Sequence, residues 1–339
     1  MKKIKLGILC PSEIALRRFL PSLEKCKDSF EYTGVACASK AEWFGSPPSK
    51  EIMEEEQEKA KNICNSFGGI IYSSYNQMLS ADIDAVYIPL PPALHAKWGM
   101  SALEQGKHVL MEKPFATNLD DADNLILLAK EKELAIHENY MFQFHQQLET
   151  IFKLIDDGEI GEIRLIRIAF GFPFRGVNDF RYDKKLGGGA LIDCGGYTLK
   201  LATLFLGDSA KITTSRLNSK DGFDVDIYGS ATMANDDGLT AQLTFGMDNS
   251  YKCDMEIWGS TGTITASRIL TAPPDFEPEL VIKTQSGEKI IKVPQDDQFL
   301  KSIQRFKMLI SDKKNREEEY EVLLKQMRLL DAVLTNHYS

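Results

Sequence analysis

Residues 106–114 read Gly-Lys-His-Val-Leu-Met-Glu-Lys-Pro. The apolar residues 109–111 predict a buried strand, and Glu112 and Lys113 follow at its carboxyl end. In open α/β sheets the carboxyl ends of the strands face the ligand crevice. Because Pro114 lacks a backbone donor and favours an extended conformation in the residue before it, we expect Lys113 to be held in place. A lysine held there can stabilise charge on a reacting oxygen, and a plain surface lysine at a strand end is the alternative.

This stretch belongs to a longer alternation of strands and helices. The expected strands are 4–10, 31–38, 70–72, 84–89, 109–111 and 135–137, and the expected helices are 12–25, 50–67, 75–79, 93–105 and 119–132. Such alternation predicts a Rossmann domain over residues 1–138, with a doubly wound parallel sheet and helices on both faces.

The pattern changes after about residue 140, where hairpin turns join long β-rich runs. The runs are 161–172, 210–218, 224–235, 238–247, 252–259, 262–267 and 279–293, and helices are expected at 144–157, 190–206, 296–311 and 316–336. We therefore expect a second, α+β domain over residues 139–339, built on a large, mostly antiparallel sheet.

Composition excludes several classes of function. The chain has 339 residues, 43% of them hydrophobic, with a net charge of −9 and no basic block, which argues against nucleic-acid binding. Its six cysteines form no Cys-x-x-Cys pair and have no histidine at ligand spacing, so we expect reduced thiols and no metal site. No apolar run approaches the ~20 residues of a membrane span, and we expect a cytoplasmic enzyme that binds no membrane.

The turn at residues 10–15, Cys-Pro-Ser-Glu-Ile-Ala, lies where a dinucleotide-binding domain usually carries Gly-x-Gly-x-x-Gly. All three glycines are replaced. Ser12 can still cap the following helix, and the backbone N–H groups at that helix start can hold a pyrophosphate. Glu13 suits such a site only if it points outward. The residues assigned to the cofactor here are Cys10, Pro11, Ser12, Glu13 and Ile14.

The end of the second expected strand distinguishes the two nicotinamide cofactors. An acidic residue there would bind the ribose hydroxyls of NAD, but this chain has Ser39 and Lys40. A hydroxyl and a cation suit a 2′-phosphate, so we predict NADP(H) over NAD(H). A polar loop without this role is the alternative.

Four motifs appear in order along the chain. They are 88–95 (Ile-Pro-Leu-Pro-Pro-Ala-Leu-His), 106–109 (Gly-Lys-His-Val), 112–114 (Glu-Lys-Pro) and 187–197 (Gly-Gly-Gly-Ala-Leu-Ile-Asp-Cys-Gly-Gly-Tyr). With them the chain resembles, over nearly its whole length, the glucose–fructose oxidoreductase / inositol dehydrogenase / rhizopine catabolism (Gfo/Idh/MocA) superfamily.

Within the superfamily the chain is most similar to the nucleotide-sugar 3-ketoreductases of deoxysugar biosynthesis. This similarity lies at 6–9, 14–18, 38–39, 138–140, 181–182, 186–191, 256–259 and 271–274. The departures are the missing turn glycines and a longer segment around 43–62.

The resemblance implies that the nicotinamide lies near Leu90, Pro91, His95 and Lys113, and Glu112 is assigned to the cofactor site with them. Leu90 and Pro91 offer an apolar wall for the ring. His95 is either a cofactor contact or a structural residue hydrogen-bonded at a helix start.

Tyr197 lies early in the expected helix 190–206, where many relatives place a histidine or tyrosine as proton donor. Tyrosine has a reference pKa of about 10, so it needs a nearby cation such as Lys113 to exchange protons near neutrality. Asp193, one turn earlier, can orient Lys113 or bind the nicotinamide ribose. The implied reaction is hydride transfer from NADPH to a sugar keto carbon, with Tyr197 protonating the alkoxide and Lys113 stabilising its charge. Proton transfer by Lys113 itself is the alternative.

Further residues are candidates for substrate. Arg17, Tyr251 and Thr271 match positions that contact the nucleotide-sugar in relatives, and Arg17 can hold a diphosphate. Arg181 is a candidate for a cofactor or substrate phosphate. The glycines 187–189 either let substrate approach the cofactor or form a tight loop.

Together these observations predict an NADP-dependent oxidoreductase that reduces a keto group of a nucleotide-linked deoxy-hexose, of the 3-ketoreductase type. A dehydrogenase of a free sugar, cyclitol or dihydrodiol is one alternative, and a non-catalytic NADP- or sugar-sensing protein is another. The resemblance also implies that the open face of the second sheet forms a homodimer or homotetramer.

Overall fold

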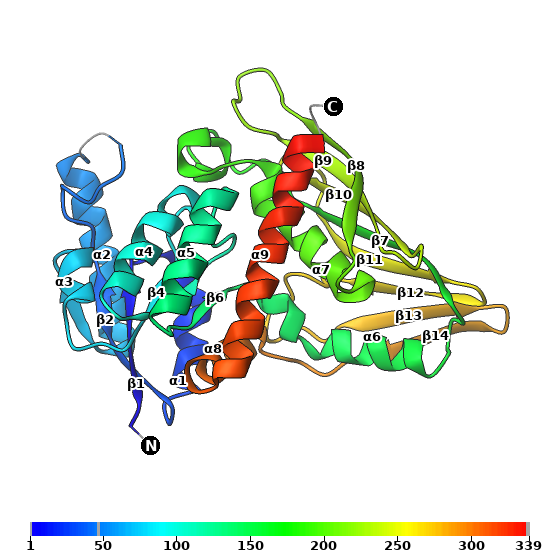
Figure 1. The fold of residues 1–339 in the computed structure, drawn as a ribbon, viewed down its shortest axis with the longest axis horizontal. Coiled ribbons are helices and arrows are strands. Elements are labelled where there is room, and N and C mark those ends of the chain that lie inside the picture. The colour runs from blue at the N-terminus through cyan, green and yellow to red at the C-terminus, as the bar shows by residue number, and fades with distance from the viewer. Residues whose placement is uncertain (1, 46–47, 337–339) are drawn as a thin grey trace. The chain divides into compact units, whose positions relative to one another are not determined.

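The computed structural model describes residues 2–45 and 48–336, which form two compact units (Figure 1). The first unit runs to Asn139 and also includes Phe299–Leu324. The second comprises Tyr140–Gln298 and the residues from Lys325 onward.

The sequence predicted a single boundary after residue 138 and so placed 299–324 in the second domain. The structure groups this segment with the first unit instead. The Tyr320 hydroxyl, fully buried, lies 2.6 Å from the backbone oxygen of Leu134 and 3.2 Å from that of Ala129. Sequence periodicity shows that this segment is helical but gives no sign of which core it joins.

The first unit is built on a six-stranded sheet in which every pair is parallel, in the order β3-β2-β1-β4-β5-β6. The strands are β1 Ile4–Leu9, β2 Phe30–Ala36, β3 Ile70–Tyr72, β4 Ala85–Ile88, β5 His108–Met111 and β6 Ile136–Glu138. The order reverses between β1 and β4, and open α/β sheets bind ligands at such a reversal, beyond the carboxyl ends of the strands.

The helices that connect these strands are α1 Leu20–Glu24, α2 Lys50–Phe67, α3 Tyr75–Leu79, α4 His95–Glu104 and α5 Leu119–Glu131. Two further helices, α8 Gln298–Ser311 and α9 Lys313–Asn336, follow the last strand of the chain, and their residues Phe299–Leu324 belong to the first unit. A 3₁₀ turn at Pro92–Leu94 precedes α4, and a π-helical turn at Ala15–Phe19 precedes α1. This π turn interrupts what the sequence predicted as one regular helix over 12–25.

The second unit is built on an eight-stranded sheet in the order β14-β13-β12-β11-β7-β10-β9-β8. Its strands are β7 Ile163–Gly171, β8 Lys211–Asn218, β9 Tyr228–Ala234, β10 Thr240–Gly246, β11 Lys252–Gly259, β12 Gly262–Ser267, β13 Glu279–Thr284 and β14 Gly287–Lys292. Only β7 and β10 pair in parallel within the part of the chain that is described. The run 279–293 is a hairpin of two strands. The structure thus confirms the predicted fold class, a Rossmann sheet followed by a mostly antiparallel one.

Two helices accompany this sheet, α6 Gln146–Asp156 and α7 Gly196–Leu206, with a π turn at Leu191–Gly195 leading into α7. Short 3₁₀ turns lie at Met141–Phe144, Phe180–Tyr182 and Lys184–Leu186. Buried and exposed positions alternate along β11, where Ile257 is buried and Trp258 is half exposed, so one face of the sheet lies in the core.

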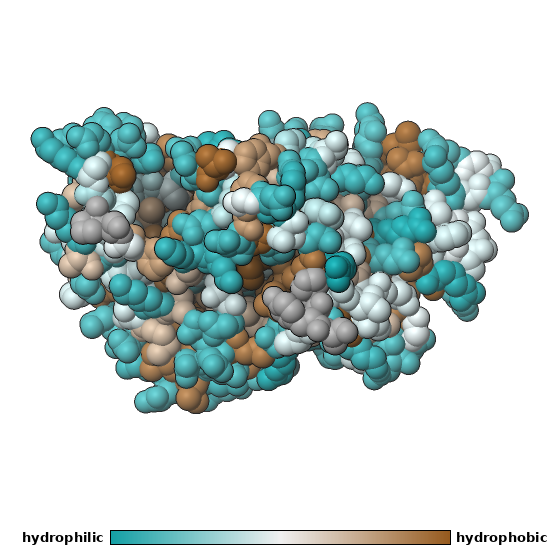
Figure 2. All heavy atoms as spheres, turned by 90° about the horizontal axis from the view of Figure 1, so that it is seen from above, coloured by the Kyte–Doolittle hydropathy of each residue, from teal (hydrophilic) through white to brown (hydrophobic). Residues whose placement is uncertain are grey.

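In the view of Figure 2 hydrophilic side chains cover most of the surface, with apolar residues in small separate patches. No helix among the residues described is both long and apolar enough to cross a bilayer.

Gly34 offers a test of the β2–β3 pairing. Its φ is +150°, and a Cβ added there would lie 2.0 Å from the backbone oxygen of Ile70. We expect Gly34→Ala to lower the free energy of unfolding by about 3 kcal/mol or more, because the strands must separate. Gly106→Ala is the control, since Gly106 has a φ of +73° but open space around it, and strain alone costs about 1–2 kcal/mol. Urea unfolding measures both, and equal losses would contradict the steric argument.

Candidate functional site

The turn after β1 keeps the backbone shape that glycine usually provides. Cys10 stands where the first fingerprint glycine would be, and its φ is +91°. The Ala15 N–H donates to the Ser12 Oγ at 3.2 Å, so Ser12 caps the helix as predicted. A non-glycine residue with a positive φ is strained, and such residues cluster at functional sites. Because the usual glycines are missing, the sequence contained no sign that this turn keeps the backbone shape of a dinucleotide-binding turn.

Glu13 points outward in this turn. Its side chain is 68% exposed, and its Oε2 lies 3.6 Å from Nε of Arg17, which is 71% exposed. Arg17 lies on the π turn, a distortion of the helix found mostly at functional sites. Burial raises the pKa of Cys10 to about 12, so its thiol stays protonated and serves as a small apolar group.

The loop after β2 is organised by Glu42, which the sequence analysis did not identify. The carboxylate accepts hydrogen bonds from the N–H and the Oγ of Ser39, both at 2.9 Å. It also accepts from the N–H of Tyr75 (3.1 Å) and from the backbone and side-chain nitrogens of Asn76 (2.9 and 2.7 Å). Burial opposes ionisation, but these bonds outweigh it and lower the pKa of Glu42.

This arrangement changes what Ser39 and Lys40 contribute. The Ser39 hydroxyl donates a hydrogen bond to Glu42, and the neighbouring Lys40 is exposed. Glu42 is an acid in the same loop, three residues after Ser39. All of its described hydrogen bonds come from Ser39, Tyr75 and Asn76, so its carboxylate is directed into the protein.

The loops after β4 and β5 meet at His95. The ring is fully buried, with Nδ1 2.6 Å from the backbone oxygen of Pro114 and Nε2 2.7 Å from that of Leu90. Burial lowers the pKa of His95 to about 4, and the Lys113 charge acts in the same direction, although the two carbonyls favour the charged ring. Both ring nitrogens face backbone oxygens. His95 therefore has the structural role of the two alternatives, because it joins the segment at Leu90 to the loop at Pro114, and its role as a cofactor contact stays a prediction.

Glu112 anchors the carboxyl end of β5. Its Oε1 accepts hydrogen bonds from the Tyr87 hydroxyl and from Nδ2 of Asn139, both at 2.7 Å. Burial raises the pKa of Glu112, while these two bonds and the charge of Lys113 act against the rise. The Glu112 N–H also donates to the backbone oxygen of Ile88 at 3.0 Å, so the backbone that carries the next residue, Lys113, is held from both its main chain and the Glu112 side chain. The Lys113–Pro114 peptide is cis.

In the second unit, the glycines 187–189 form a tight loop that packs directly against the backbone of residue 181. A Cβ on Gly188 would lie 2.3 Å from the backbone oxygen of Arg181. Asp226 caps the helix that follows, because its Oδ2 accepts from the N–H of Leu191 at 2.7 Å. Of the two alternatives for residues 187–189, a tight loop or space for substrate to approach the cofactor, the structure shows the tight loop.

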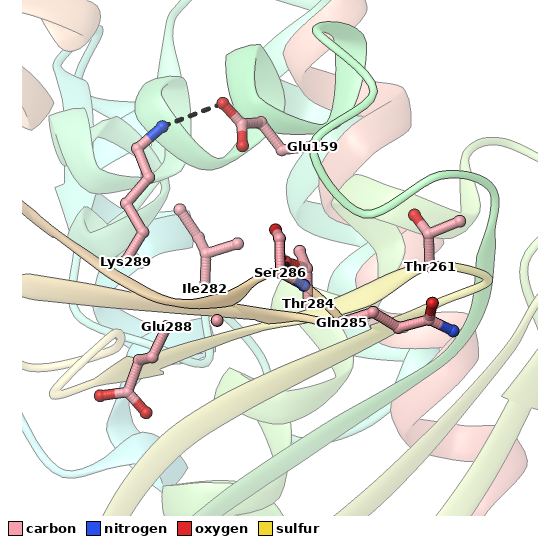
Figure 3. Close-up of a pocket in the computed structure, with 9 residues that line it drawn as sticks. Glu159, Thr261, Ile282, Thr284, Gln285, Ser286, Glu288 and Lys289 are labelled. Carbon is pink, nitrogen blue, oxygen red and sulfur yellow. Dashed lines mark hydrogen bonds and ion pairs between the residues drawn. The ribbon is translucent and has the colours of Figure 1, made fainter.

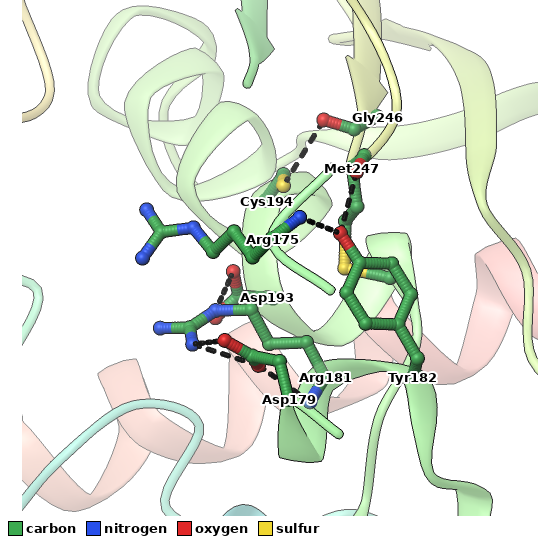
Figure 4. Close-up of polar contacts among 8 residues, drawn as sticks. All are labelled: Arg175, Asp179, Arg181, Tyr182, Asp193, Cys194, Gly246 and Met247. Atoms are coloured by element: carbon green, nitrogen blue, oxygen red, sulfur yellow. Dashed lines mark hydrogen bonds and ion pairs between the residues drawn. The ribbon is translucent and has the colours of Figure 1, made fainter. Parts of the chain in front are cut away.

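Asp193 lies on the π turn that follows this loop, and Arg181 binds it (Figure 4). Nε of Arg181 donates to Asp193 Oδ2 at 2.8 Å, and its Nη1 donates to both carboxylate oxygens of Asp179, at 3.1 and 3.2 Å. Burial opposes the charge of Arg181, but the two acids outweigh it and raise its pKa. One cation between two carboxylates leaves a net charge of −1, which does not suit the phosphate predicted for Arg181. Asp193 is oriented by Arg181, a contact that the sequence did not predict.

Tyr197 follows in α7, within a ring of aromatic side chains. Its ring centroid lies 5.0 Å from that of Tyr140, 5.2 Å from Phe170 and 5.8 Å from Phe142. Its hydroxyl is 4.0 Å from Sδ of Met141, and the residue is 6% exposed. The aromatic packing sets the position of the phenol.

The structure brings Tyr251 and Thr271 together, with their hydroxyl oxygens 3.4 Å apart. Arg268, which the sequence analysis missed, lies 5.5 Å over the Tyr251 ring and 5.7 Å over the ring of Phe276. Arg268 has a φ of +51°, a conformation found at constrained positions. The cluster offers two hydroxyls, an exposed aromatic ring and a cation.

One surface hollow lies elsewhere, along the β13–β14 hairpin (Figure 3). Short polar side chains and the Glu159–Lys289 ion pair line it. It contains none of the predicted site residues, and its chemistry suggests no ligand. Within the ranges 2–45 and 48–336 no three histidine, cysteine or acidic side chains gather as a metal site would require.

Comparisons with known proteins agree with this architecture. The model of an oxidoreductase family with an NAD-binding Rossmann fold matches residues 37–140, and that of the Gfo/Idh/MocA C-terminal domain matches residues 148–265. A dTDP-3,4-didehydro-2,6-dideoxy-α-D-glucose 3-reductase from Actinomadura kijaniata is 37% identical over 98% of this chain and 95% of its own length. The same-named reductase of Streptomyces violaceoruber is 34% identical over 98% of this chain and 95% of its own.

A 3-ketoreductase from Actinomadura kijaniata, solved with NADP and TDP-benzene, superposes with a TM-score of 0.90 and 36% identity, covering 99% of this chain and 98% of its own. Variants of that enzyme with one tyrosine replaced by phenylalanine, or one lysine by alanine, were solved with the same two ligands.

The Rossmann sheet and the second, mostly antiparallel sheet, together with the matching family models and relatives, identify an oxidoreductase. The chain belongs to the Gfo/Idh/MocA family, as its motifs predicted.

Glu42 provides a test of the loop after β2. We expect Glu42→Gln to lower the free energy of unfolding by about 2–4 kcal/mol at pH 7, because its amide cannot accept all five hydrogen bonds. The folded pKa of Glu42 is lowered, so its contribution is present above the unfolded value of about 4.3 and is lost as the pH falls through the folded value. The difference between wild type and variant should therefore shrink below about pH 4.

Urea unfolding at several pH values measures this difference. Glu58→Gln is the control, since the described contact of Glu58 is an exposed pair with Lys61, and its loss should change stability by less than about 1 kcal/mol. A Glu42→Gln difference that is the same at every pH would contradict the assignment.

Proposed function

We propose that the chain is an NADP-dependent ketoreductase that transfers a hydride to a keto group of a nucleotide-linked deoxy-hexose. The observation that carries the proposal is the pair Lys113 and Tyr197. These residues have the same types as the two substituted in the 3-ketoreductase of Actinomadura kijaniata, and they are separated by the same 84 positions.

The first unit fits NADP. The positive φ of Cys10 and the capped helix start leave backbone N–H groups directed at a pyrophosphate. Glu42 is held inward, and Lys40 supplies the cation for the 2′-phosphate. Leu90 and Pro91 form the apolar wall for the nicotinamide, fixed through His95. When bound, NADPH supplies the hydride.

Lys113 and Tyr197 divide the remaining chemistry. Lys113 stabilises the negative charge that develops on the carbonyl oxygen, and Tyr197 gives that oxygen its proton. The aromatic side chains packed around Tyr197 limit its motion, and Arg181 fixes Asp193. Both side chains, from α7 and from the π turn that precedes it, are therefore preorganised. In the alternative, Lys113 itself transfers the proton.

The nucleotide is assigned to Tyr251, Thr271 and Arg268. Tyr251 is half exposed and can stack on a base, and Arg268 is a cation for the diphosphate. Arg17 is a second candidate, because its only described ion pair is the long, exposed contact to Glu13.

The central experiment follows NADPH fluorescence during incubation with dTDP-3,4-didehydro-2,6-dideoxy-α-D-glucose. We expect turnover with NADPH to exceed that with NADH by at least about tenfold, and dTDP to compete with the sugar substrate. Turnover of free keto-sugars that dTDP does not inhibit would favour the free-sugar dehydrogenase. NADPH binding without turnover of any keto-sugar would favour the sensing protein.

Two substitutions test the assigned roles. Removing a positioned acid or a charge stabiliser lowers kcat by about 10²-fold or more, and we expect this for both Tyr197→Phe and Lys113→Ala. The exposed residues Tyr228 and Lys97 provide matched controls as Tyr228→Phe and Lys97→Ala, which should leave kcat within about twofold. Unchanged kcat in Tyr197→Phe would transfer the proton-donating role to Lys113.

A further inference from the structure

A series of polar contacts in the first unit includes Glu112, the residue before Lys113, and continues from it to α8 and α9. We call it the Glu112 network. Its members, in order of contact, are Tyr87, Glu112, Asn139, Ser302, His137, Glu319 and Arg305. The proposed reaction uses none of the residues beyond Glu112.

The network begins with hydrogen bonds of fixed direction. Nδ2 of Asn139 donates to Glu112 Oε1 at 2.7 Å, which turns the amide oxygen of Asn139 away from Glu112. Ser302 Oγ donates to that amide oxygen at 2.7 Å. Because a hydroxyl has one proton, Ser302 accepts from Nε2 of His137, 3.1 Å away.

The far end of the network is charged. Nδ1 of His137 lies 2.6 Å from Oε1 of Glu319, and the other oxygen of Glu319 accepts from Arg305 at 3.1 Å. Arg305 also donates to the side-chain oxygen of Asn315 at 2.6 Å. Each step therefore fixes the orientation of the next, from the guanidinium to the amide that holds Glu112.

Burial makes the network costly to disturb. His137, Asn139 and Ser302 are each at most 1% exposed, and Glu319 is 7% exposed. A buried polar group that loses its partner cannot form a replacement hydrogen bond with water. Removing one member therefore destabilises the orientation of the members that bond to it. Ser302 and Glu319 come from α8 and α9, more than 160 positions beyond Asn139 and His137 in the chain.

We propose that Ser302 and His137 are positioning residues for Lys113, acting through Asn139 and Glu112. They hold the Asn139 amide so that it keeps donating to Glu112, and Glu112 in turn fixes the backbone from which Lys113 projects. This inference rests on the proposed role of Lys113 in the reaction.

The network also controls the charge beside Lys113. The groups that act on Glu112 are Lys113 itself, the Tyr87 hydroxyl on β4 and the Asn139 amide after β6. Burial raises the pKa of Glu112 and all three groups oppose the rise. When Ser302 no longer holds Asn139, the amide is free to turn, and the pKa of Glu112 should rise further.

The first test is independent of activity. We expect Ser302→Ala to speed backbone hydrogen exchange of residues 112–116 by about tenfold, measured by mass spectrometry on the full-length protein. Tyr320→Phe is the matched control, since Tyr320 lies on α9 and its described hydrogen bonds go to the backbone oxygens of Ala129 and Leu134, which are not members of the network. Unchanged exchange in Ser302→Ala, or an equal increase in Tyr320→Phe, would overturn the inference.

The second test separates positioning from stability. With NADPH and the dTDP-keto-sugar, Ser302→Ala should lower kcat about tenfold at unchanged KM, because misplacement of a reacting group mainly affects the transition state. The acidic limb of the kcat profile should move to higher pH as Glu112 becomes easier to protonate. Ser302→Thr, which keeps the hydroxyl, should restore both.

The outcomes distinguish this inference from the proposed function. If the wild type reduces no keto-sugar, the proposed function fails, and hydrogen exchange alone decides the inference. If the wild type is active, a loss in Ser302→Ala that Tyr320→Phe shares overturns the inference and leaves the function standing.

Discussion

The carboxyl end of β5 depends on one partly buried carboxylate held by its two neighbouring strands. Glu112 accepts from Tyr87 on one side and from Asn139 on the other, both at 2.7 Å. His95 adds a second restraint on the same loop, through the backbone oxygen of Pro114. A lysine side chain has many rotamers, and it acts at a defined atom only when the backbone that carries it is fixed.

Both π-helical turns of the described chain coincide with residues assigned to function. Arg17 lies on the turn before α1, and Asp193 lies on the turn before α7. A π turn rotates the side chains that follow it relative to a regular helix and loosens the local hydrogen bonding, so it is kept mainly where a particular direction is needed. Near the second turn, the close approach of Gly188 to the Arg181 backbone fixes the start of the helix.

Several acidic side chains in this protein serve as internal hydrogen-bond partners. Glu42 holds the Ser39 loop against α3, Asp226 caps the helix before α7, and Asp193 pairs with Arg181. Each of these carboxylates accepts hydrogen bonds from protein donors, and for Glu42 they lower the pKa.

The sequence by itself determined the alternation of strands and helices, the change to an antiparallel sheet, the family and the residue types of the candidate site, because periodicity and short motifs are local properties. Only the tertiary structure decided that 299–324 joins the first unit, that Glu42 faces inward, that Arg181 is neutralised by two acids, and that His95 holds two loops together. These outcomes depend on which side chains meet across gaps of tens to hundreds of residues. Burial, hydrogen-bond direction and the pairing of charges are properties of those meetings, and no local pattern encodes them.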